Sequence, residues 1–527
     1  MKEKIREIGA KLWLYVLLLI VMVLVIMMKK DYHMDEVFSY GLANNVGQTS
    51  IHPEFAPFTY ENPAQIYLDY MVIQEGEGFD IGNCWYNQER ESSPPLYYLA
   101  VHMMSVFAGQ RFTRWTAGVI NLFFMIWTFY LFRKILGLFG VQGKKLTCFS
   151  LFFMASPAIL SIVSFFRMYT MAICFATLMT YLVLKYRKQE SLQFYIYMML
   201  AAIAGVLTQY YLIFYLFFLS LIYGISLLWE KEWGKAVKYI VTMGIAGISA
   251  CLIFPAITAQ LFSASRGTEG IENFRKGFDV HWQNFKEYCG ILNDQLFGGL
   301  FVLLLIAAAL MLIWGLVQRK KSPEIEKNQR IDRESVWNCC IAFLPTAGYV
   351  VLVSMVAPYN TDRYVMAVFA MMIIFLLLGA DYVLSFCLSH KAAVKNGIFA
   401  AICAVLLFSI WKDFRWPYLY LNSAQRLEEM EAYSDVDGLC VLDVGWKISG
   451  NFNDIIKLKT MTFFENDISG LEFMDGLKEK DEYILYVVGN DPEQTINQIY
   501  NICPQINTAD YLWKVDYADI YHLYHTN

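Results

Sequence analysis

Long apolar runs restrict the possible folds of this sequence more than any other feature. The hydrocarbon core of a bilayer is about 30 Å thick, and an α-helix needs roughly 20 mostly apolar residues to cross it. The 527-residue chain is 57% hydrophobic and 17% charged, whereas soluble domains carry about 25% charge. We therefore expect an α-helical polytopic membrane protein with about eleven transmembrane helices. The runs lie at residues 12–29, 115–133, 146–164, 168–185, 193–209, 211–229, 236–262, 296–317, 337–357, 364–388 and 396–411.

The first apolar run decides how the chain enters the membrane. It follows the basic start Lys2 to Arg6, as both a signal anchor and a signal peptide would. A cleaved signal peptide needs a small-residue cleavage site, and none follows Met28. We expect a retained signal anchor with a cytoplasmic N-terminus.

Short basic loops orient the other runs, because Lys and Arg in such loops stay on the cytoplasmic side. The basic connections lie at residues 133–145, 185–188, 231–238, 319–333 and 390–395. With these inside, the extracytoplasmic side receives the segment 31–114, hairpins near Arg167 and Gln209, the loop 263–295, the turn 359–362 and the C-terminal tail.

The apolar segment 94–108 does not fit this scheme as a span. If it crossed the membrane, every basic loop up to Lys238 would change sides. We expect a re-entrant or interfacial helix at the outer face instead.

The tail beyond about Leu421 differs in composition from the rest. Residues 421–527 hold 19 acidic and 7 basic residues, within a chain of net charge −5. Such an acidic tail disfavours nucleic acid and anionic lipid as partners. Strand-like runs alternate with polar helical stretches and predict a small α/β extracytoplasmic domain. The strand-like runs lie at 440–444, 483–488 and 519–524.

The outer loop 31–93 is the richest in groups that could do chemistry. It carries eleven carboxylates, one Arg and many aromatics, and Asp35-Glu36 lies near its start. A carboxylate at the mouth of a membrane helix can act as general base on an acceptor hydroxyl. The alternative is that Asp35 and Glu36 merely solvate a helix exit.

Two prolines open the segment 94–108. Pro94 and Pro95 fix the direction of helix entry and remove amide donors that would be unpaired there. We expect Tyr97 and Tyr98 at headgroup level, where interfacial aromatics gather. A plain interface anchor is the alternative.

Two arginines lie at predicted outer turns. Arg167 lies between two apolar runs, and Arg363 lies at the turn before the run 364–388. Ionisable groups at such depth are functional candidates, and a guanidinium can bind a phosphate through a bidentate fork. Both would converge on one face if the helices bundle. Snorkelling to lipid headgroups is the alternative for each.

Several chemistries lack a signature. The sequence contains no GxxxxGK[ST] loop, no GxGxxG after a strand and no HExxH motif. A soluble nucleotide-sugar donor is not normally found outside the membrane. A lipid-borne donor reached from the bilayer is therefore favoured.

Taken in order, these motifs resemble the GT-C superfamily of membrane glycosyltransferases. The likeness is greatest to the family 39 group, which includes protein O-mannosyltransferases and the lipid A aminoarabinose transferase. It covers about residues 10–410 and rests on Asp35-Glu36, Pro94-Pro95-Leu96-Tyr97-Tyr98, Arg167-Met168-Tyr169, Gln209-Tyr210-Tyr211 and Asp362-Arg363-Tyr364.

The resemblance implies inverting transfer of a sugar from a polyprenyl-phosphate donor to an acceptor in the cell envelope, within the lipid bilayer and at its outer face. It implies that Asp35 is the general base, that Glu36 supports it or contacts the acceptor, and that Arg363 and Arg167 neutralise the donor phosphate. The family reaction does not require a bound metal. Substrate-binding roles fall to Tyr97, Tyr98, Tyr169, Glu91, Tyr210 and Tyr364.

The chain departs from the family pattern at two places. Relatives often carry His or Lys where this chain has Ser92-Ser93, and Glu91 or Arg90 would substitute. The usual Thr-His-Tyr is here Thr208-Gln209-Tyr210. We expect residues 1–411 to form the transmembrane glycosyltransferase module, including the outer loop 31–114, and 421–527 to form the acidic domain.

Two other function classes remain open at this point. One is a polytopic transporter or flippase, although the charged residues gather at one membrane face and no inverted repeat is visible. The other is a non-catalytic envelope assembly protein that uses the acidic tail as its binding module.

Overall fold

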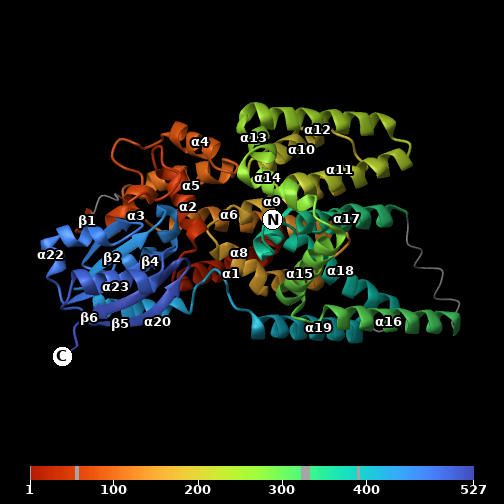
Figure 1. Ribbon diagram of the computed structural model, residues 1–527. Coiled ribbons are helices and arrows are strands. Elements are labelled where there is room, and N and C mark those ends of the chain that lie inside the picture. The colour runs from red at the N-terminus through yellow and green to blue at the C-terminus, as the bar shows by residue number, and fades with distance from the viewer. Residues whose placement is uncertain (1, 54–57, 322–332, 389–391, 527) are drawn as a thin grey trace. The chain divides into compact units, whose positions relative to one another are not determined.

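The computed structural model describes residues 2–53, 58–321, 333–388 and 392–526, which form two compact units (Figure 1). The first unit contains the chain up to Met27, Ser92–Tyr97 and Gly118–Trp416; the second contains Met28–Glu91, Tyr98–Ala117 and the chain from Pro417. Most of the basic connection 319–333, and His390 of the connection 390–395, lie outside the described residues.

The first unit is built from helices. They are α1 (Lys2–Met28), α6 (Trp115–Leu138), α7 (Gly143–Ala155), α8 (Pro157–Ser164), α9 (Tyr169–Tyr186), α10 (Leu192–Val206), α11 (Leu212–Trp229), α12 (Trp233–Ile253), α13 (Ala256–Phe262), α14 (Ser265–Phe274), α15 (Phe278–Phe297), α16 (Phe301–Lys321), α17 (Arg333–Val356), α18 (Phe369–Cys387) and α19 (Ala392–Asp413). Two 3-10 turns, η2 (Asp362–Tyr364) and η3 (Met366–Val368), precede α18.

Length and composition make this a multi-pass membrane protein. Seven described helices can cross a membrane, namely α6, α9, α11, α12, α17, α18 extended back to Met366, and α19. The number rises to nine if two bent pairs, α7 with α8 and α15 with α16, each count as one span. The expected eleven spans exceed this number because two of the predicted runs form the shorter apolar helices Leu12–Met28 and Leu192–Val206.

The bends in the two broken pairs have local causes. Pro157 occupies the first turn of α8, where a ring without an N–H ends the preceding helix, and the pair bends by 50°. Gly298 and Gly299 separate α15 from α16 with φ of 57° and 78°, and that pair bends by 76°. Glycine adopts this left-handed conformation at little cost.

The second unit joins the outer loop to the tail. Its helical elements are α2 (Met34–Asn44), α3 (Ala64–Met71), α4 (Ile81–Arg90), most of α5 (Leu96–Ala108), α20 (Ser423–Met430), η4 (Glu431–Tyr433), η5 (Gly445–Asn451), α21 (Phe452–Ile455), η6 (Ser469–Phe473), α22 (Asp475–Lys478) and α23 (Pro492–Ile502). Its strands are β1 (Phe58–Tyr60), β2 (Asp437–Leu442), β3 (Thr460–Glu465), β4 (Glu482–Val488), β5 (Thr508–Val515) and β6 (Ala518–Tyr524).

Helix α5 occupies the segment whose crossing was in question. It has 13 residues, which at 1.5 Å per residue gives roughly 20 Å. This is too short to cross the bilayer core of about 30 Å alone. The helix is thus compatible with the expected re-entrant or interfacial element.

One six-stranded sheet forms the centre of the second unit (Figure 1). The strand order is β1-β3-β2-β4-β6-β5, with β3, β2 and β4 parallel and the other pairs antiparallel. Strand β1 comes from the outer loop and pairs with β3 of the tail, Thr59 opposite Thr462. The loop expected to belong to the membrane module is therefore grouped with residues 417–526, because it supplies an edge strand of their sheet.

The central strand β2 is buried along its whole length. Helix α23 and η6 cover one face of the sheet through a core that includes Leu439, Leu485 and Ile499. Near the other face, Tyr67 of α3 donates a hydrogen bond to the Ile448 carbonyl over 2.9 Å. Parallel strands normally need cover on both faces, and here the outer loop supplies part of it.

Helices α2 and α3 approach each other closely at Gly41. A Cβ added to this glycine would overlap the ring of Tyr70. Tyr70 is fully buried and its hydroxyl donates to the Thr49 carbonyl over 2.9 Å. The ring therefore has little freedom to withdraw.

We predict that Gly41→Ala destabilises the second unit by about 1–3 kcal/mol, the usual cost of overpacking a filled core. Thermal unfolding of the full chain in detergent measures the loss as a lower Tm. Gly78→Ala is the matched control because a Cβ there meets nothing within 4 Å. Equal Tm values for the two variants would contradict the close approach of α2 and α3.

Candidate functional site

The Asp35-Glu36 pair begins helix α2, and a capping box holds this start. The His33 ring nitrogen Nδ1 accepts a hydrogen bond from the Asp35 amide over 3.0 Å. The Glu36 carboxylate accepts one from the His33 amide over 2.7 Å. Both acids lie in the first turn, where the helix dipole favours negative charge. The sequence His33-Met34-Asp35-Glu36 thus explains why the helix starts here.

Glu36 is committed to a buried ion pair. Its Oε2 lies 2.9 Å from Nζ of Lys29, and the two side chains are 0% and 1% exposed. Lys29 also donates to the Tyr418 carbonyl over 2.6 Å. A buried carboxylate with these partners is suited to hold the start of α2 in place. This geometry favours the supporting role expected for Glu36 over contact with an acceptor.

Asp35 differs from its neighbour in exposure. Its side chain is 21% exposed and lies 3.7 Å from the His33 ring, while its carbonyl accepts from the Ser39 hydroxyl over 3.0 Å. Of the two acids, Asp35 is the one that solvent reaches. Its carboxyl also interacts electrostatically with Asp516. Burial, followed by the charge of Asp31, raises the pKa of Asp516.

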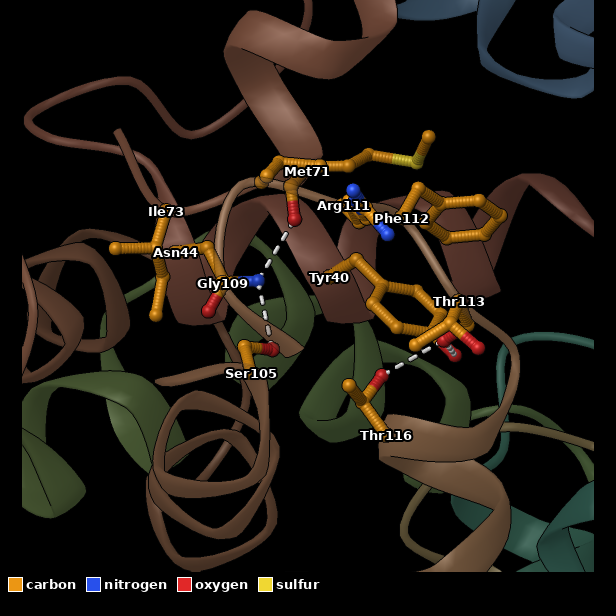
Figure 2. Close-up of a pocket in the computed structure, with 11 residues that line it drawn as sticks. Tyr40, Asn44, Met71, Ile73, Ser105, Gly109, Arg111, Phe112, Thr113 and Thr116 are labelled. Carbon is orange, nitrogen blue, oxygen red and sulfur yellow. Dashed lines mark hydrogen bonds between the residues drawn. The ribbon is translucent and has the colours of Figure 1, made fainter. Parts of the chain in front are cut away.

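A small hollow with a mixed polar and apolar lining lies further along α2 (Figure 2). The Asn44 amide lies in its wall and donates to the Met71 carbonyl over 2.7 Å and to the Ser105 hydroxyl over 3.0 Å. Asn44 follows Asp35 by nine positions, roughly 13 Å along a helix. None of the predicted site residues lines this hollow.

In the first unit, tyrosines gather around the turn at η2. The rings of Tyr211 and Tyr364 lie 5.0 Å apart, and the Tyr349 hydroxyl donates to the Tyr364 carbonyl over 2.6 Å. Tyr211 also interacts electrostatically with Tyr169 and Tyr288. The hairpins that carry Tyr169 and Tyr211 therefore lie near the η2 turn.

Both predicted phosphate-binding arginines belong to these turns. The Arg363 guanidinium lies over the Tyr364 ring, 5.2 Å from its centre. Arg167 is 9% exposed and its amide donates to the Phe165 carbonyl over 2.8 Å. Tyr169 lies two positions after Arg167 and interacts electrostatically with Tyr349. The turns of the two arginines are thus brought together.

The other predicted site residues are buried, cap a helix or bind a neighbouring side chain. Tyr97 and Tyr98 are 0% and 1% exposed, so their rings do not lie at a surface as an interfacial anchor would. Glu91 caps the C-terminus of α4, and its amide donates to the Asn87 carbonyl over 3.1 Å. The Tyr210 hydroxyl donates to the Gln260 side chain.

The sequence analysis did not identify the charged residues around the 29–36 segment. Lys29, Asp31, Arg426 and Asp454 are all largely buried and ion-paired. Their one sequence signal is that Lys29 is the only charged residue of the first apolar run, 12–29. The partners in the tail are separated from it by nearly four hundred residues, so no local pattern links them.

We predict that Glu36→Ala lowers the Tm of the full chain, with a loss of about 3–5 kcal/mol, because Lys29 keeps a buried charge without its partner. Thermal unfolding in detergent measures the loss. Asp35→Asn is the comparison variant. Its Tm should change little, since a partly exposed acid contributes little to the free energy of unfolding. If Lys29→Met/Glu36→Leu is no more stable than Glu36→Ala, the buried ion pair is not the cause.

Comparison with known proteins bears on the fold. No protein-family model and no curated protein matches the chain. The crystal structure of ArnT from Cupriavidus metallidurans bound to undecaprenyl phosphate is 10% identical, covers 98% of both chains and has a TM-score of 0.50. The same protein in the apo state, also 10% identical over 98% of both chains, has a TM-score of 0.36. The chain therefore has an ArnT-like fold along nearly its whole length, which confirms the GT-C-like fold expected from its sequence.

Proposed function

We propose that this protein transfers a sugar from a polyprenyl-phosphate-linked donor to a lipid, glycan or protein acceptor of the cell envelope. The observation that carries the proposal is the ArnT-like fold, since the ArnT structure with that fold is bound to undecaprenyl phosphate. The acid-bearing turn of α2 and the arginine-bearing turns agree with it. The N-terminus is cytoplasmic and the second unit extracytoplasmic in this proposal, as the basic loops favour.

Asp35 is the general base of the proposed reaction. Its carboxylate takes the proton of the acceptor hydroxyl as the oxygen attacks the anomeric carbon, while the bond from that carbon to the phosphate breaks. Attack from the opposite side inverts the anomeric centre. The partial exposure of Asp35 supports this role, and Glu36 holds the turn through Lys29.

Arg363 and Arg167 bind the donor phosphate in the same proposal. The leaving polyprenyl phosphate gains negative charge as the glycosidic bond breaks, and a guanidinium placed beforehand stabilises that charge. Tyr169, Tyr210 and Tyr364 lie on the same turns or beside them and bind the substrate there. Tyr97 and Tyr98 are buried and Glu91 caps α4, so we propose no substrate contact for these three.

We predict that Asp35→Asn lowers kcat by about 10²–10⁴-fold, the usual contribution of a positioned base. The assay reconstitutes the full chain with a panel of polyprenyl-phosphate sugars and follows labelled sugar into envelope fractions. Glu75→Gln is the control, because Glu75 is an exposed carboxylate of the same outer loop. Unchanged transfer by Asp35→Asn would exclude Asp35 as the base. Absence of transfer from every donor by the unsubstituted chain would exclude the function.

We predict that Arg363→Met lowers kcat by about 10²–10³-fold, the cost of removing one charge-stabilising donor. Arg363→Lys should recover part of the rate, since it keeps the charge but loses the planar fork. Rates from the same transfer assay compare the two. An equal and small effect of both variants would indicate that Arg363 only anchors the turn to lipid headgroups.

A further inference from the structure

The segment from Lys29 to Asp31 is attached to the tail at each of its residues. Lys29 donates to the Tyr418 carbonyl, as described above. The Lys30 amide donates to the Leu419 carbonyl over 2.9 Å. The Asp31 carboxylate accepts from the Asn453 side chain over 2.7 Å and pairs with Arg426. No position in this segment is free to move without breaking a contact to residues 418–453.

Arg426 of α20 holds two carboxylates at once. One guanidinium nitrogen binds Asp31, and the other lies 3.2 Å from Asp454 of α21. The side chains of Arg426, Asp31 and Asp454 are 13%, 4% and 0% exposed. We call Arg426, Asp31, Asn453 and Asp454 the Arg426 clasp. A planar fork is the group suited to bridging two carboxylates in this way.

An aromatic cluster packs beside the clasp. The Tyr32 ring lies 6.1 Å from Phe452 and 5.3 Å from Phe112. Phe112 in turn lies 4.9 Å from Tyr40 of α2. The tail residue Phe452, next in sequence to Asn453, also lies 5.3 Å from Phe112. It therefore contacts Tyr32 before the α2 start directly, and Tyr40 within α2 through Phe112. The clasp and this cluster together fix the turn that carries Asp35.

The carboxylates of Asp31 and Asp454 differ in their hydrogen bonds. Asp31 has two further donors, the Tyr32 amide over 2.8 Å and Asn453. Asp454 has no hydrogen-bond partner for either oxygen among the described residues. Burial raises the pKa of Asp454 to about 7, against the opposing charges of Arg426 and Lys457. Asp31 is therefore the carboxylate to which Arg426 donates a hydrogen bond, and Asp454 is held by charge alone.

We propose that Arg426 is a positioning residue for Asp35, through which the C-terminal domain holds the catalytic turn in its working geometry. This inference rests on the proposed function for its catalytic meaning, while the structural coupling stands apart from it. It gives the acidic tail a role that the sequence left unassigned. A misplacement of about 1 Å in a reacting group can cost roughly 10²-fold in rate, so a loosened turn should be visible in kcat.

The experiment must separate positioning from folding. Arg426→Met alone leaves the Asp454 carboxyl buried without its guanidinium, so a lower Tm is expected for that reason. In Arg426→Met/Asp454→Asn this carboxyl is replaced by a neutral amide, and the Tm should recover toward that of the unsubstituted chain. Asp31 still lacks its guanidinium in the double variant. Lys514→Met is the matched control, because its partner Asp519 forms an exposed pair elsewhere on the same sheet.

Two measurements on the full chain in detergent decide the proposal. Hydrogen exchange of residues 30–37 should be at least 10-fold faster in the double variant than in Lys514→Met. In the transfer assay its kcat should fall at least 10-fold with the donor KM unchanged, and Arg426→Lys should recover part of this loss.

The outcomes distinguish this proposal from the proposed function. Exchange and kcat at control values in the folded double variant would overturn it, because Arg426 would then only neutralise Asp454. Faster exchange with an unchanged kcat would also overturn the positioning of Asp35. If no polyprenyl-phosphate sugar is transferred by the unsubstituted chain, the proposed function fails, and the exchange measurement alone decides whether Arg426 holds this turn.

Discussion

The buried ion pair between Lys29 and Glu36 is the contact on which the acid-bearing turn depends. Taking two charges out of water is costly and is repaid only when the geometry is good and other hydrogen bonds are satisfied. Here both conditions hold, since Glu36 also accepts the His33 amide and Lys29 also donates to Tyr418. The pair therefore sets where the first apolar helix ends and where α2 begins.

This contact assigns different tasks to two adjacent acids. Glu36 is fully buried and holds the turn, whereas Asp35 keeps partial contact with solvent. A residue that holds the backbone cannot readily take part in proton transfer, because losing its charge would release Lys29. A short acidic motif can therefore place one carboxylate in a buried ion pair and leave its neighbour partly exposed to solvent.

The second unit is assembled from chain segments that are far apart in sequence. Strand β1 of the outer loop completes the sheet of the tail, and Asp31 pairs with Arg426 across a separation of 395 positions. Closing so long a loop lowers the entropy of the chain, and many contacts must form together to offset this loss. The fold of the tail and the position of Asp35 therefore depend on each other.

The apolar runs of the sequence determined the membrane class and most of the helices, because the length of an apolar run is a local pattern that the bilayer thickness constrains directly. The expected fold came from the resemblance of the short motifs to a known family. The sequence also indicated the α/β character of the tail and three of its strands. Only the tertiary structure decided that the outer loop belongs to the sheet of the tail, that Tyr97 and Tyr98 are buried, and that Glu36 is paired with Lys29. These features depend on contacts between segments far apart in sequence, and the periodicity of a sequence reports only local structure. The Asp35-Glu36 pair could be proposed as a site from its place in the chain, but distinguishing its two acids required knowing which one is buried.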